Sequence, residues 1–188
     1  MLHMSQKDYN IAIVEYLIKT GNKGSHIRSL AKLLGTNQTT IARKTEELYK
    51  KNILDFRREG KNKVFYLKNT LEAKQFVYIT ELDKLTRTIT KYPALTRVVE
   101  QIINNNKISL AILFGSYAKE IPSKDSDIDI YIDTSNRKIK EEVELIDSRI
   151  SVKIGDYDTS SLLIKEIDTN HVIIKGAETY YGKNRFFS

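Results

Sequence analysis

Apolar residues recur at intervals of three and four residues three times within the first fifty positions, which predicts three helices. The stripes are Ile11, Val14, Leu17 and Ile18; then Ile27, Leu30, Ala31 and Leu34; then Ile41, Thr45 and Leu48. Ser25 and Asn37 precede the second and third stripes as candidate N-caps, and Gly35 follows the second as a candidate helix end. Because so few residues separate Gly35 from the third helix, the pattern predicts a tight helix-turn-helix.

Two short strands are predicted at residues 53–57 and 63–67, on either side of a Gly60-containing turn. Over residues 8–68 this order resembles the winged helix-turn-helix of bacterial and archaeal transcription regulators. The resemblance implies that the third helix enters the major groove of double-stranded DNA and that the hairpin lies along the phosphates. The implied contacts are Gln38, Thr39, Thr40, Arg43 and Lys44 on the helix, and Arg57, Arg58, Lys61 and Lys63 on the hairpin. Dimerisation and protein docking remain alternatives for such a module.

The spacing of apolar residues over residues 70–91 predicts one long amphipathic helix, which ends before Pro93. Its apolar stripe is Tyr78, Leu82, Leu85 and Ile89; the next helix carries Leu95, Val98, Val99, Ile102 and Ile103. We expect a domain boundary here, with the long helix acting either as a rigid arm or as a surface through which two chains pair into a homodimer.

A continuous apolar strand at residues 110–114 leads directly into Gly115 and Ser116, and ten residues later the chain reads Asp127-Ile128-Asp129. Strand alternation places the two aspartates side by side on one face. Two adjacent carboxylates favour Mg²⁺, which also binds phosphate oxygens. Gly115 lets the backbone approach a phosphate closely, and Ser116 offers its hydroxyl.

This motif resembles the nucleotidyltransferase superfamily that includes DNA polymerase beta and kanamycin nucleotidyltransferase, specifically its minimal nucleotidyltransferase branch. The resemblance covers residues 108–188. Together with the winged-helix resemblance and the predicted long helix, it indicates an α+β protein of two domains: a winged helix at residues 1–68, a helical connector at 69–106, and at 107–188 a mixed sheet flanked by helices. It also implies transfer of a nucleoside monophosphate, chiefly AMP from ATP, to a macromolecular acceptor with two Mg²⁺ ions. A partner toxin is one such protein acceptor.

The motif of the family normally includes a third carboxylate on a later strand, and here the sequence departs from it. The later strand is predicted at residues 149–154, where Lys153 faces the aspartates. We expect Asp156, redirected by a bulge at Gly155, as the third acid alongside Asp127 and Asp129. If Lys153 occupies that place instead, metal binding weakens and the domain becomes catalytically weak or inactive. Lys119 is a further candidate phosphate contact.

The net charge of +7 is concentrated in one part of the chain. Residues 1–68 carry 14 basic and 6 acidic side chains, whereas the remainder is nearly neutral. A basic first third favours a polyanion partner. Cysteine is absent, and no apolar run approaches the roughly 18 residues of a membrane span. We expect a cytoplasmic protein without a signal peptide. The two hypotheses are therefore a nucleotidyltransferase with a DNA-binding winged helix, and a DNA-binding regulator whose nucleotidyltransferase-like domain is a sensor or scaffold.

Overall fold

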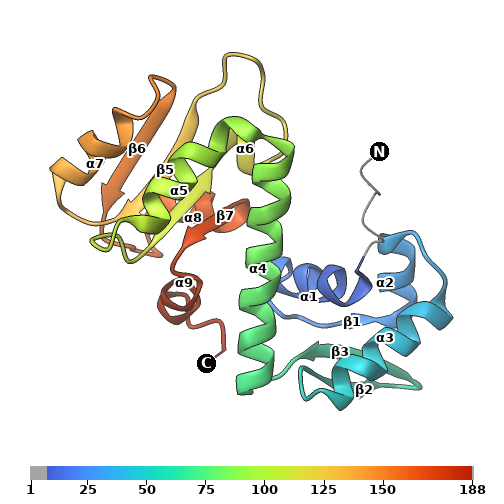
Figure 1. Cartoon of the computed structure of the whole chain (residues 1–188). Coiled ribbons are helices and arrows are strands. Elements are labelled where there is room, and N and C mark those ends of the chain that lie inside the picture. Colours follow the sequence, from blue (N-terminus) through green and yellow to red (C-terminus); the bar gives the residue numbers. More distant parts are fainter. Residues whose placement is uncertain (1–7, 188) are drawn as a thin grey trace. The chain divides into compact units, whose positions relative to one another are not determined.

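The computed structural model describes residues 8–187, and these residues form two compact units (Figure 1). The first unit contains residues 8–80 together with Phe187, and the second contains residues 81–186. Within the described part of the chain, no helix is both long and apolar enough to cross a membrane.

The first unit consists of three helices and a three-stranded antiparallel sheet of order β1-β3-β2. Its elements are α1 (Tyr9–Lys19), β1 (Ser25–His26), α2 (Ile27–Leu34), α3 (Gln38–Lys50), β2 (Leu54–Glu59) and β3 (Asn62–Leu67). The three predicted helices and the hairpin are confirmed. The core takes at least two members from each predicted stripe, including Val14, Leu30 and Ile41, because their spacing places them on one helix face.

Local signals set two of the three predicted helix ends. The Asn37 side chain accepts a hydrogen bond from the Thr40 N–H at 2.7 Å, so its predicted role as an N-cap is confirmed. Gly35 ends α2 in the left-handed conformation. The prediction that Ser25 caps α2 is wrong: Ser25 is buried in β1, where it pairs with Phe65, and the helix begins at Ile27. A strand of two residues depends on its distant partner and leaves no periodic signal.

Helix α4 (Leu71–Lys91) is confirmed, but its buried face differs from the predicted one. Leu82 is 63% exposed, whereas the neighbouring Glu81 is buried, as are Thr80 and Thr88. These polar side chains are buried because they find hydrogen bonds: each threonine donates to a backbone carbonyl one turn earlier, and Glu81 accepts from the Tyr181 hydroxyl. The predicted stripe is confirmed at Leu85, which is buried, and at Ile89, which packs against the core, and it is wrong at Leu82.

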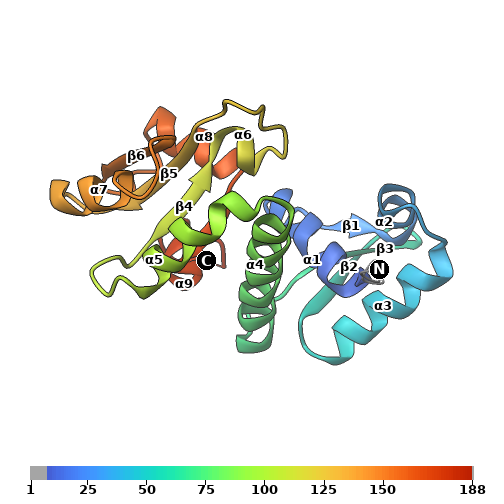
Figure 2. The same cartoon turned by 45° about the horizontal axis from the view of Figure 1, so that its top comes forward.

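The second unit contains the end of α4, a short 3-10 helix at Pro93–Leu95, and a four-stranded mixed sheet with helices on both faces (Figure 2). The remaining elements are α5 (Thr96–Asn104), β4 (Ala111–Phe114), α6 (Gly115–Ala118), β5 (Ile128–Asp133), α7 (Arg137–Glu144), β6 (Ile150–Gly155), α8 (Leu162–Thr169), β7 (Val172–Lys175) and α9 (Ala177–Lys183). The strand order is β6-β5-β4-β7; β5 and β6 are parallel, and β4 runs antiparallel to both of its neighbours. The expected α+β class with a mixed sheet is confirmed.

The two faces of β5 have different environments. Ile128, Ile130 and Ile132 are fully buried and join a core with apolar residues of α5 and α7. Strand alternation sends Asp129, Tyr131 and Asp133 to the opposite face. The carboxylates of this strand therefore lie on the face away from the main apolar core.

Candidate functional site

The turn between β4 and α6 lies directly against the Asp129 carboxylate. Phe114 at the end of β4 is paired with Asp129 on β5, and Gly115 follows with a φ of +68°. A methyl group added at Gly115 would overlap an Asp129 carboxylate oxygen. Glycine is thus required here both by backbone conformation and by space. The packing brings the Gly115 turn and the aspartate strand together at one place.

Ser116 is half-buried in the same turn, and its backbone carbonyl accepts the N–H of Ile121 at 3.0 Å. Its hydroxyl makes no hydrogen bond to any residue of the described chain. The first N–H groups of α6 have no partner one turn earlier in the helix. The turn therefore carries hydrogen-bond donors beside a carboxylate.

The pKa of the Asp129 carboxyl is raised, and the charged residues that shift this pKa are its neighbours in the site. Burial raises the pKa most, and the negative charge of Asp127 raises it further. The positive charges of Lys153 and Lys119 lower the pKa, and Glu166 raises it. Because burial and a like charge both disfavour the ionised form, a cation bound between the two aspartates would relieve the repulsion.

The register of β5 and β6 decides which residues lie beside the aspartates. Ser151 is directly opposite Asp129, and Lys153 is opposite Tyr131, two positions further along the same face. Asp156 lies beyond the end of β6, where its charge acts on the Tyr131 hydroxyl. Beside Asp129, β6 thus presents a hydroxyl and an ammonium group.

The charge of Glu166 on α8 acts on Asp129, a neighbour that the sequence analysis missed. Its carboxylate lies 3.2 Å from the Lys119 ammonium, so the candidate phosphate contact Lys119 is engaged in an ion pair. A signal for α8 existed: Ser161 caps the helix by accepting from the Ile164 N–H. That signal predicts a helix, but not that one of its side chains approaches β5.

The donor set fits one divalent cation better than two. The prediction that both aspartates lie on one strand is only half right: Asp129 is in β5, whereas Asp127 directly precedes the strand. The charge of Asp127 still acts on Asp129, and such a pair of carboxylates suits one Mg²⁺ held jointly with phosphate oxygens. The next carboxylate on the strand face of Asp129, Asp133, is 3.0 Å from the Lys183 ammonium and accepts a hydrogen bond from the Tyr157 N–H. Between residues 8 and 187, no three His, Cys, Asp or Glu side chains gather closely enough to hold a metal.

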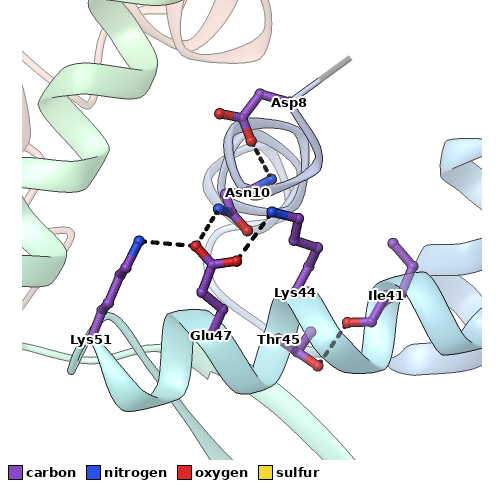
Figure 3. Close-up of polar contacts among 7 residues, drawn as sticks. All are labelled: Asp8, Asn10, Ile41, Lys44, Thr45, Glu47 and Lys51. Atoms are coloured by element: carbon purple, nitrogen blue, oxygen red, sulfur yellow. Dashed lines mark hydrogen bonds and ion pairs between the residues drawn. The ribbon is translucent and has the colours of Figure 1, made fainter. Parts of the chain in front are cut away.

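The predicted DNA-contact residues of α3 have different surroundings. Gln38, Thr39 and Arg43 are exposed, and the Thr40 N–H is bound by the Asn37 cap. Lys44 is instead drawn toward Glu47, which also accepts hydrogen bonds from Lys51 and from Asn10 of α1 (Figure 3). Lys44 therefore contributes to the junction of α1 and α3.

The predicted DNA-contact residues of the hairpin also divide into side chains with partners in the chain and exposed side chains without them. Arg57 pairs with Glu59 at 3.0 Å and donates to the Lys23 carbonyl, and the Lys63 ammonium lies 3.9 Å from the centre of the Phe56 ring. Arg58 and Lys61 are exposed and pair with no residue of the described chain. These two side chains are free to contact an external anion.

Comparison with known proteins bears on the second unit. Residues 97–185 match the family model described as Polymerase beta, Nucleotidyltransferase. The match supports placing this part of the chain in the nucleotidyltransferase superfamily, and the mixed sheet is consistent with that fold. No curated protein matches the chain at a significant level.

Proposed function

We propose that residues 97–185 bind a nucleoside triphosphate with Mg²⁺ and transfer its nucleoside monophosphate to a macromolecular acceptor. The observation that carries the proposal is the packing of the Gly115 turn against the Asp129 carboxylate. It brings hydrogen-bond donors suited to a phosphate next to a carboxylate suited to a metal ion. The family match over the same residues supports a transfer reaction at this site.

Each group has a distinct role in this proposal. Asp127 and Asp129 would hold Mg²⁺, which neutralises phosphate charge when bound. The Ser116 hydroxyl and the N–H groups of α6 hold the triphosphate by hydrogen bonds. An acceptor oxygen then bonds to the α-phosphorus, pyrophosphate leaves, and the proton of the acceptor is released to water.

We propose ATP as the donor and a protein, such as a partner toxin, as the acceptor. To test this, the full chain is incubated with Mg²⁺ and α-labelled ATP, in the absence and in the presence of cell extract, and the label incorporated into protein is measured. Asp127→Asn and Asp129→Asn should each reduce incorporation by about 100-fold or more, because each removes a metal-binding charge. Equal incorporation by the wild type and both variants would contradict the proposal.

We further propose that the first unit is a winged helix that binds double-stranded DNA. The exposed start of α3 and the unpaired Arg58 and Lys61 of the hairpin support it, as does the basic excess of residues 1–68. Arg43→Ala and Arg58→Ala should weaken duplex binding and lower the dependence of log affinity on log salt by about one each if they contact phosphates. Lys44→Ala, which removes an ion-paired lysine, should have the smaller effect. Unchanged affinity in both arginine variants would contradict it.

The alternative function is a DNA-binding regulator whose second unit is a catalytically weak or inactive sensor or scaffold. The lysine at position 153 of β6 and the lack of a three-acid cluster among the described residues favour it. One result separates the two functions. The enzyme labels an acceptor and releases pyrophosphate, whereas the regulator binds duplex DNA and does neither.

A further inference from the structure

Among the residues that the structure describes, one of the two lysines that act on Asp129 has no partner. Two lysines act on the Asp129 carboxylate, Lys119 and Lys153. Lys119 is held by Glu166, whereas Lys153 is exposed and forms no hydrogen bond or ion pair with any residue between 8 and 187. Lys153 is therefore the lysine at this site that is available to an external anion.

The position of Lys153 follows from backbone pairing. The parallel register aligns it with Tyr131, the residue two places after Asp129 on the same strand face. Strand alternation keeps its side chain on that face, because Val152 and the half-buried Ile154 pack into the core on the other. The ammonium group thus lies on the side of the sheet where a triphosphate would bind.

A fixed cation beside two carboxylates has opposite effects on two ligands. It repels a divalent metal ion that the carboxylates attract, and it attracts the phosphates that such an ion brings. Asp133, the next carboxylate on that strand face, lies four residues from Asp129, about 13 Å along the strand, and is paired with Lys183. It therefore supplies no oxygen for a second ion beside the first.

We propose that the Lys153 ammonium takes the place of a second metal ion, so that the site holds one divalent cation between Asp127 and Asp129 while Lys153 binds the triphosphate. This inference rests on the proposed nucleotide site. It makes Lys153 a nucleotide-binding residue and the site a one-metal site.

The test uses Mn²⁺ as a probe, with free Mn²⁺ measured by electron paramagnetic resonance, on the full chain. In Mn²⁺ alone, Lys153→Ala should bind the ion about fivefold more tightly than the wild type, because a repelling charge is removed. With a non-hydrolysable ATP analogue and Mn²⁺, the same variant should bind the analogue about tenfold more weakly. The wild type should hold one Mn²⁺ per chain in the complex.

Two variants serve as controls. Lys138→Ala makes the same charge change on α7, the helix that covers the opposite, apolar face, and should leave both affinities unchanged. Lys153→Arg keeps the charge and should remain close to the wild type in both assays. A merely structural role for Lys153 would not shift the two affinities in opposite directions.

The outcomes separate this inference from the proposed function. Two Mn²⁺ per wild-type chain with the analogue, or a Lys153→Ala variant that behaves like Lys138→Ala, would overturn the inference even if nucleotide binds. A wild type that binds no analogue at all would contradict the proposed function, and the binding of Mn²⁺ alone would still decide whether Lys153 opposes the metal.

Discussion

Replacing Gly115 by alanine tests whether the contact between the turn and Asp129 builds the site. The residue has a φ of +68°, where a side chain costs about 1–2 kcal/mol. In addition, the new methyl group would overlap the Asp129 carboxylate, so that carboxylate or the turn must move. A displacement near 1 Å at a catalytic group costs about 100-fold in rate. We therefore expect label transfer to fall by about that factor, and MgATP binding to weaken by more than twofold because a displaced carboxylate or turn no longer meets the bound phosphates and metal.

Gly21→Ala is the matched control. Gly21 has a φ of +61°, and a methyl group there would meet no atom within 4 Å. Both variants should lose a few degrees of melting temperature from backbone strain. Only Gly115→Ala should lose nucleotide binding, measured by the MgATP-dependent rise in melting temperature and by calorimetry. If Gly115→Ala binds MgATP within twofold of Gly21→Ala, the close packing of turn and carboxylate is not what forms the site.

Two further predictions concern the dependence of stability on pH. Hydrogen bonds from Lys51 and Lys44 lower the pKa of Glu47 to about 2, so the stability it provides should be present above about pH 4.5 and lost as the pH falls toward 2. Glu47→Gln should flatten that loss in thermal melts, whereas Glu46→Gln, in a longer and exposed pair, should not; equal profiles for the two variants would contradict the role of the junction. Burial, with a smaller contribution from the charge of Lys84, lowers the pKa of His171 to about 3. Below about pH 6.5 the imidazole of His171 is therefore protonated in the unfolded chain but stays neutral in the folded chain. The free energy of unfolding should consequently fall by up to about 1.4 kcal/mol per pH unit between pH 6 and 4. His171→Leu should remove that slope in urea unfolding followed by circular dichroism, and an unchanged slope would show that another group titrates.

Local patterns predicted most elements of both units. The three-residue and four-residue spacings placed α1, α2, α3 and α5, and the apolar run before Gly115 placed β4. Where prediction failed, a distant partner had overridden the local signal. Ser25 pairs with Phe65 rather than capping a helix, and Glu81 is buried because Tyr181 donates to it.

The sequence by itself determined that Asp129 points to the strand face opposite the isoleucines and that a glycine turn precedes it, because strand alternation and glycine conformation are local properties. It also placed Lys153 on a strand facing the two aspartates. Only the tertiary structure decided that Gly115 packs on Asp129, that Ser151 rather than Lys153 lies directly opposite it, and that Glu166 of α8 engages Lys119. Strand register and helix docking are set by packing between segments far apart in the chain, and that packing decides which charges surround the aspartate pair.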